Sequence, residues 1–140
     1  MKKKVLIVVS DYYKGISGPL LKSAKKYINK KSHLKIIKVP GVFEIPVIIS
    51  KNIKKFDGFV AIGCIIKGKT AHFDLISKSV IDAIMNISID SKKPVGNCIL
   101  TCFNYKQALV RKNKGKEAAL ALNSIPVSYT HLTLPTTPYV

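Results

Sequence analysis

The segment Lys67–Asp74 carries the richest set of reactive side chains in the sequence. His72 can accept or donate a proton near neutral pH, because an imidazole titrates in that range. Gly68 lets a ligand approach the backbone, and Thr70 places a hydroxyl just before a predicted helix, where free N–H groups attract anions. The segment therefore predicts a phosphate-binding turn beside a proton-transfer group. A purely structural interpretation stays open, with Thr70 as an ordinary helix cap and His72 as an incidental polar residue.

Three further side chains could take part in chemistry, and each also has a simpler explanation. Glu44 follows a Pro-Gly turn, where it could accept hydrogen bonds from a polyol or amine, or only favour a helix start through the helix dipole. Tyr12 could stack on a flat ring or only pack at the end of a strand. Arg111, the single arginine, could hold a phosphate with two parallel hydrogen bonds or lie unpaired on the surface.

The pattern of strands and helices indicates how these distant residues could meet. Apolar runs rich in β-branched residues predict strands buried on both faces, and helical stripes of apolar residues lie between them. Strands are predicted at Lys4–Ser10, Leu34–Val39, Gly58–Ile66 and Pro94–Leu100, with one helix opening at Ser17-Gly18-Pro19 and others over 43–54, 73–90, 105–112 and 114–124. This alternation predicts an α/β domain with a parallel sheet and helices on both faces.

The segments that follow the four predicted strands are expected to share one edge of the sheet. In parallel α/β sheets, ligands bind beyond the carboxyl ends of the strands. Polar or aromatic residues stand in each of these segments, at 11–13, 40–44, 67–74 and 101–104. We therefore expect the four segments to form one site.

The composition narrows the classes of function. The chain of 140 residues predicts one domain, and no apolar run is long enough to span a membrane. The net charge of +17 raises the possibility of nucleic-acid binding, but it comes almost entirely from dispersed lysines, whereas base readers favour arginine. A solvated lysine surface is therefore favoured over a polyanion site. Cys64, Cys98 and Cys102 lack metal-ligand spacing and are typical of reduced thiols in a cytoplasmic protein.

The final segment, residues 127–140, differs from the rest of the chain. All 24 basic and 7 acidic side chains lie within residues 1–126. The string VSYTHLTLPTTPYV also resembles the conceptual translation of a sequencing-library adapter. We hypothesise that the domain covers 1–126 and that 127–140 is a non-native tail. Resequencing the locus and finding the same tail encoded would refute this hypothesis.

Several motifs, in this order along the chain, resemble those of the 6,7-dimethyl-8-ribityllumazine synthase family. The matching strings are VPGVFEIP (Val39–Pro46), IIKGKTAHFD (Ile65–Asp74), GNCILT (Gly96–Thr101), QALVR (Gln107–Arg111) and NKGKEAA (Asn113–Ala119). Two motifs, VPGVFEIP and the GKTAHFD part of IIKGKTAHFD, are quite specific. The resemblance covers about residues 4–124.

The resemblance implies a fold, a reaction and an assembly. The expected fold is a flavodoxin-like three-layer sandwich with a four-stranded parallel sheet. The expected enzyme is a transferase of riboflavin biosynthesis that condenses 5-amino-6-(D-ribitylamino)uracil with 3,4-dihydroxy-2-butanone 4-phosphate, releasing phosphate and water. No metal or organic cofactor is implied. The partners implied are the two small-molecule substrates and further copies of the chain, in pentamers or multiples of them.

The same resemblance assigns roles to individual residues. His72 would transfer protons, and the phosphate would bind to Gly68, Lys69, Thr70 and Arg111. The other substrate would contact Tyr12, Val42, Phe43, Glu44, Ile65, Ile66, Asn97 and Lys114. Two departures from the family pattern concern Asn97 and Lys114, and a third is a C-terminal helix cut short by the tail. Many members have an aromatic residue at the position of Asn97 that reaches a neighbour's site, and the link from Arg111 to Lys114 is about five residues shorter than in the family pattern.

Two other classes of function compete with the enzyme. A non-catalytic flavodoxin-like module would hold a flavin or nucleotide without turnover. A basic RNA-associated protein would bind with an affinity that falls linearly with the logarithm of salt concentration. The scarcity of arginine and the absence of interleaved aromatic and basic residues disfavour the second of these.

Overall fold

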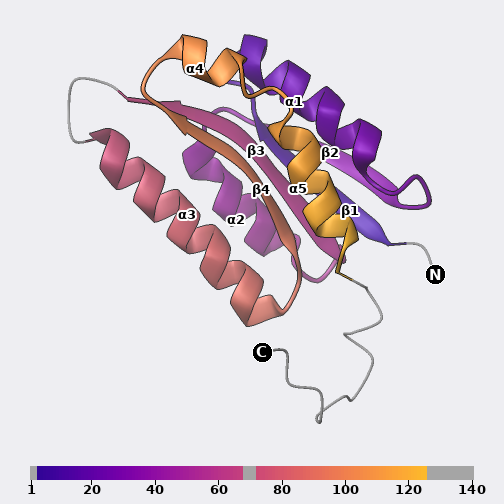
Figure 1. Ribbon diagram of the computed structural model, residues 1–140. Helices are drawn as coiled ribbons and strands as arrows, with labels where there is room; N and C mark the ends of the chain where they lie inside the picture. Colours follow the sequence, from indigo (N-terminus) through magenta and orange to yellow (C-terminus); the bar gives the residue numbers. More distant parts are fainter. Residues whose placement is uncertain (1–2, 68–71, 126–140) are drawn as a thin grey trace.

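Strands and helices alternate along the chain in the computed structural model, which describes residues 3–67 and 72–125 (Figure 1). Two strands, Lys4–Ser10 and Gly58–Ile66, have the predicted bounds. The elements in chain order are β1 (Lys4–Ser10), α1 (Lys14–Tyr27), β2 (His33–Val39), the 3-10 turn η1 (Val42–Glu44), α2 (Ile45–Lys51), β3 (Gly58–Ile66), α3 (His72–Ser91), β4 (Val95–Cys102), α4 (Tyr105–Leu109) and α5 (Lys114–Asn123).

The four strands form one parallel sheet in the order β2-β1-β3-β4. The two central strands, β1 and β3, are almost entirely buried, which explains their unbroken apolar runs. From β1 the chain moves outward to β2 and then returns past β1 to β3. The order therefore reverses between β1 and β3, and such a reversal opens a crevice at the carboxyl ends of the two strands.

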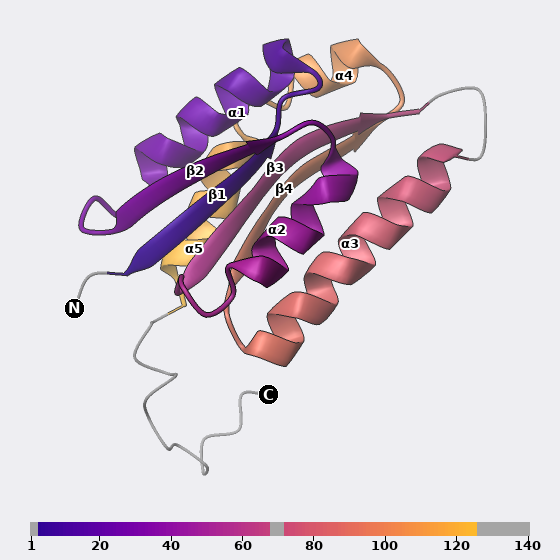
Figure 2. The ribbon, with the colours of Figure 1, turned by 180° about the vertical axis from the view of Figure 1, so that it is seen from behind.

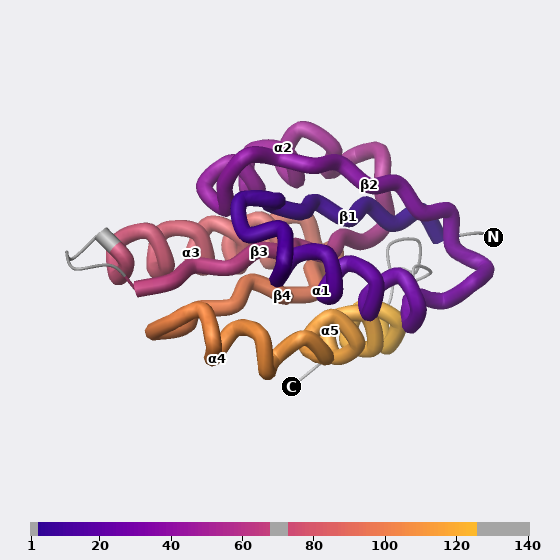
Figure 3. Tube along the Cα trace, turned by 90° about the horizontal axis from the view of Figure 1, so that it is seen from above, coloured from indigo at the N-terminus to yellow at the C-terminus, as the bar shows by residue number. Residues whose placement is uncertain are grey.

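The helices cover both faces of the sheet. Side chains of α1, α4 and α5 pack against one face, while η1, α2 and α3 cover the other (Figures 2 and 3). Along β1, Val5 and Ile7 point into the first layer and Leu6 into the second, as the alternation of a strand requires. The predicted three-layer α/β sandwich is confirmed. None of the helices in 3–67 and 72–125 is both long and apolar enough to cross a membrane.

The first helix begins earlier than the sequence predicted. We expected it to open at Ser17-Gly18-Pro19, but α1 starts at Lys14, and the N–H of Ser17 already donates to the carbonyl of Tyr13 at 2.9 Å. The reason is burial, because the side chains of Ile16 and Ser17 are both buried in the first turn. Pro19 consequently lies inside the helix, where it cannot donate a backbone hydrogen bond.

Other boundaries also differ from the prediction, and α4 ends at Leu109 and not at residue 112. The single helix expected over 43–54 is split into η1 and α2, and α2 ends at Lys51. Pro46 stands in the first turn of α2, where its missing N–H costs no helical hydrogen bond. The fourth strand was expected to end at Leu100, but it continues to Cys102, because its last two residues pair with the end of β3.

Candidate active site

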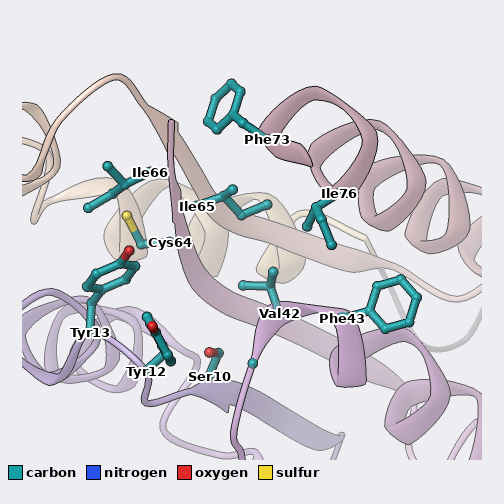
Figure 4. Close-up of a pocket in the computed structure, with 11 residues that line it drawn as sticks. Ser10, Tyr12, Tyr13, Val42, Phe43, Cys64, Ile65, Ile66, Phe73 and Ile76 are labelled. Atoms are coloured by element: carbon teal, nitrogen blue, oxygen red, sulfur yellow. The ribbon is translucent and has the colours of Figure 1, made fainter. Parts of the chain in front are cut away.

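A pocket lies where the strand order reverses, at the carboxyl ends of β1 and β3 (Figure 4). Its volume is about 340 Å³, within the range of small-molecule sites. We call it the sheet-edge pocket. Its lining comes from the ends of β1 and β3, from η1 and from the start of α3: Ser10, Tyr12, Tyr13, Gly41, Val42, Phe43, Cys64, Ile65, Ile66, Phe73 and Ile76.

The floor and side walls of the sheet-edge pocket are apolar. Ile65 and Ile66 stand on successive positions of β3 and therefore point to opposite faces of the sheet at its edge. Val42 is buried at the start of η1 and packs over Gly63. A Cβ at Gly63 would overlap the Val42 side chain, so this glycine lets η1 approach β3 closely. The walls are thus fixed by the same contacts that build the core.

Two aromatic side chains stand exposed at the mouth of the pocket. Tyr12 is 73% exposed and Phe43 is 62% exposed. Figure 4 shows them on different elements, one after β1 and the other in η1. Exposed aromatic rings that line a cavity are suited to stacking on a flat heterocycle.

Glu44 holds the turn between β2 and η1. Its Oε1 atom accepts a hydrogen bond from the N–H of Gly41 at 3.0 Å. Gly41 itself lines the sheet-edge pocket, whereas Glu44 is not among the lining residues. The observed contact of the carboxylate is therefore structural, and it shapes the mouth of the pocket.

Cys64 brings a thiol to the inner part of the pocket. Burial, followed by the proximity of Cys102, raises the pKa of this thiol to about 12. Because the thiolate is the nucleophilic form, a thiol with so high a pKa stays neutral and inert near pH 7. Cys64 therefore serves as a small apolar surface in this site.

The start of α3 reaches the sheet-edge pocket through Phe73 and Ile76. His72 is the first residue of that helix, and its side chain lies outside the described part of the structure. The predicted phosphate-binding residues Gly68, Lys69 and Thr70 lie outside the described residues. The position of α3 nevertheless brings the N-terminus of a 20-residue helix to the pocket, and a helix N-terminus attracts anions.

A second cavity, of about 430 Å³, lies beside the edge strand β4. We call it the β4-side cavity. It contains two of the predicted binding residues, Arg111 and Lys114, and none of the described residues lines both cavities. Its lining residues are Ile99, Leu100, Thr101, Val110, Arg111, Asn113, Lys114 and Glu117.

The charged side chains of the β4-side cavity are loosely held. Nη1 of Arg111 donates to Sγ of Cys102 at 3.7 Å, a weak contact. Nζ of Lys114 lies 3.4 Å from Oε1 of Glu117, and both side chains are largely exposed. An exposed pair of this kind contributes little to stability. Both cations are therefore available to an anionic ligand.

Asn97 lies away from the sheet-edge pocket. It is exposed on β4, and its side-chain oxygen accepts a hydrogen bond from the N–H of Ile99 at 3.0 Å. Of the residues predicted to form one site, the structure brings together Tyr12, Val42, Phe43, Ile65 and Ile66. Asn97, Arg111 and Lys114 are on the β4 side of the same chain.

Several lining residues were not singled out from the sequence. Phe73 and Ile76 belonged to the apolar stripe of a predicted helix, and Cys64 to a predicted strand, so both patterns indicated only core packing. Tyr13 stands next to Tyr12 in the same strand-end segment. That adjacency was the one available signal, because either tyrosine could have faced the ligand.

Comparisons with known proteins agree with the motifs. The family model described as 6,7-dimethyl-8-ribityllumazine synthase matches residues 2–126. A relative of that name from Bartonella henselae is 42% identical over 130 residues, which cover 86% of this chain and 84% of the relative. Relatives of the same name from Buchnera aphidicola and Zymomonas mobilis are 39% and 38% identical, and the matches cover 85% and 84% of this chain and 82% and 90% of those proteins.

Proposed function

The chain belongs to the 6,7-dimethyl-8-ribityllumazine synthase family, and we propose that it catalyses the reaction of that name in riboflavin biosynthesis. The substrates are 5-amino-6-(D-ribitylamino)uracil and 3,4-dihydroxy-2-butanone 4-phosphate. The amine attacks the ketone and water leaves to give an imine, phosphate is then eliminated, the ring closes on the remaining carbonyl, and a second water is lost. The observation that carries the proposal is a match along nearly the whole domain, with the two most specific motifs contributing residues to one pocket.

The sheet-edge pocket would hold the ribitylaminouracil. Tyr12 and Phe43 offer aromatic faces to a flat pyrimidine, while Val42, Ile65 and Ile66 form the apolar walls behind it. Glu44 would act from the rim, through the turn that it holds and through its second carboxylate oxygen. Such a pocket accelerates a condensation mainly by holding two reactants in register.

His72 would transfer protons between the two substrates. Its place at the start of α3 supports this role, because Phe73 and Ile76 of the same helix line the pocket. The helix N-terminus also favours a neutral imidazole, which can act as a base. The neighbouring Gly68, Lys69 and Thr70 would bind the phosphate of the second substrate together with Arg111.

Arg111 would reach that phosphate from a neighbouring subunit. Within one chain, Arg111 lines the β4-side cavity, whereas the start of α3 lies at the sheet-edge pocket. We therefore propose a homo-oligomer, a pentamer or a multiple of one, in which the β4 side of one subunit completes the pocket of the next. Asn97 and Lys114 would lie at the same junction. Asparagine cannot stack on a ring as an aromatic residue does, so Asn97 would contribute at most a polar contact.

Exposed apolar side chains support an assembly. Leu75, Met85 and Ile89 are 67%, 56% and 62% exposed along one face of α3. Beside the β4-side cavity, Phe103 and Val110 are 65% and 76% exposed. Surfaces with several large apolar side chains usually mark association sites. The cytoplasmic location expected from the reduced cysteines, all three of which are free and buried, stays a prediction.

Turnover distinguishes the enzyme from a binding module. Purified protein supplied with both substrates should form the fluorescent lumazine and release phosphate in equal amounts. A flavodoxin-like module would instead retain a flavin or the pyrimidine and release no phosphate. If the protein retains a ligand but forms no product, whichever substrate is added first, the enzymatic proposal is rejected.

A further inference from the structure

Tyr13 lies at the inner side of the sheet-edge pocket, and the matched motifs give it no role. It follows β1 directly after Tyr12 and lines the pocket near Cys64 and Ile66 (Figure 4). Its ring is partly buried and packs against the core formed by α1 and α5. The hydroxyl end of the ring is therefore the part of Tyr13 that is available to a ligand.

The Tyr13 ring is held between two other tyrosines. Its centroid lies 4.8 Å from that of Tyr12, with the ring planes at 86°, and 6.2 Å from that of Tyr105, at 63°. Both are edge-to-face arrangements, which aromatic pairs favour. Tyr105 opens α4, so the pair also links the pocket to that helix. These contacts fix the position of the Tyr13 hydroxyl and support the exposed ring of Tyr12 from behind.

Two other polar groups of the pocket are already hydrogen-bonded within the chain. The Ser10 hydroxyl donates to the carbonyl of Pro40 at 3.4 Å, and the N–H of Gly41 donates to Glu44 at 3.0 Å. The hydroxyl of Tyr13 makes no hydrogen bond to any residue in 3–67 and 72–125. Burial, followed by the proximity of Tyr12 and Cys64, raises its pKa, so it remains a neutral donor and acceptor.

We propose that the Tyr13 hydroxyl is a specificity-determining contact that hydrogen-bonds the ribitylaminouracil substrate. The substrate is rich in hydroxyl, carbonyl and amine groups, and a partly desolvated hydroxyl in a fixed position discriminates in favour of such groups. The inference rests on the proposed function for the identity of the ligand. It assigns to Tyr13 the polar contact and to Tyr12 the stacking surface.

The test compares wild-type protein with Tyr13→Phe, which removes one oxygen and keeps the ring. Both are titrated with 6,7-dimethyl-8-ribityllumazine, whose fluorescence reports binding and which retains the ribityl chain. We expect Kd to rise about fivefold in Tyr13→Phe, as for the loss of one neutral hydrogen bond. Tyr105→Phe is the matched control, because the Tyr105 hydroxyl lies against Gly15 and not in the pocket. Its Kd should stay within about twofold of wild type.

Steady-state kinetics supply a second readout that a structural role would not produce. Tyr13→Phe should raise KM for ribitylaminouracil by the same factor and leave kcat and KM for the butanone phosphate nearly unchanged. Equal Kd and equal KM values in wild type and Tyr13→Phe would overturn the inference, while turnover by the wild type would leave the proposed function standing. A wild type that neither binds nor forms the lumazine would reject both.

Discussion

The sheet-edge pocket and the β4-side cavity are built in opposite ways. The first is walled by buried or partly buried residues, such as Val42 of η1 and Ile65 of the central strand β3, with aromatic rings at its mouth. The second lies on the edge strand β4, the link after α4 and the start of α5, and its cations Arg111 and Lys114 are exposed. One region is shaped for a flat organic ring, and the other attracts a charged group.

Under the proposed function, this difference would mean that each chain carries two halves of a site. A condensation of a pyrimidine with a phosphorylated ketone needs both an apolar slot and cations, and here the two requirements are met on separate surfaces. Within one chain the apolar slot and the cations line separate cavities, although β4 is hydrogen-bonded to β3. Joining them between two chains requires only that neighbouring subunits pack side by side. The following predictions test this division of roles.

The largest effect is expected on the pocket side of the division, at the start of α3. His72→Ala should lower kcat by about 10² or more, as for a lost general acid–base group, with little change in lumazine binding. His33→Ala is the matched control, because His33 is exposed at the opposite end of the sheet, where β2 begins. Phosphate release and lumazine fluorescence measure both rates. An unchanged rate in His72→Ala would remove this residue from the mechanism.

A smaller effect, confined to one substrate, is expected on the cavity side. Arg111→Met should raise KM for the butanone phosphate by about 10- to 100-fold, because a charge-assisted contact to phosphate is lost. KM for ribitylaminouracil should change little, since that substrate occupies the other region. Lys112→Met is the control: this neighbouring exposed lysine does not line the β4-side cavity. A rise in both KM values would contradict the separation of the two regions.

The β4-side cavity depends on the packing of α5 against α1, and substitutions at that contact should change the free energy of unfolding. A Cβ at Gly115 would overlap backbone atoms of Leu20 and Ala24, so Gly115→Ala should lower the free energy of unfolding by about 2 kcal/mol. Gly18→Ala, with nothing within 4 Å of the added carbon, should instead raise it by about 0.5–1 kcal/mol through helix propensity. Urea unfolding measures both. Equal changes in the two variants would disprove the close contact.

The sequence predicted the pocket side well because strong local patterns define it. The apolar runs of β1 and β3 have only one stable environment, and the rule that ligands bind at the carboxyl ends of parallel strands then places the site. The position of Arg111 was not predictable in the same way. It depends on α4, five residues long, whose start is fixed by a hydrogen bond of 2.9 Å from the N–H of Gln107 to the side chain of Asn104.

Tertiary contacts also decided what local patterns could not. Helix α1 extends back to Lys14 because Ile16 is buried, although Ser17 and Pro19 suggested a later start. The strand β4 extends to Cys102 because β3 offers it partners there. The expectation that all four strand-end segments form one site in a single chain treated the sheet edge as one surface. In the structure, residues of the first three segments line the sheet-edge pocket, whereas Thr101 of the fourth segment lines the β4-side cavity.

The most direct test of the central claim is complementation between two impaired variants, assayed at a butanone phosphate concentration far below the KM of Arg111→Met. His72→Ala and Arg111→Met chains, carrying different affinity tags, are co-expressed and the mixed oligomers are purified through both tags. If each site joins the pocket of one subunit to the β4 side of the next, random mixing leaves about a quarter of the sites with both residues intact. The account therefore predicts about a quarter of wild-type turnover. Mixed oligomers no more active than either variant alone would contradict it.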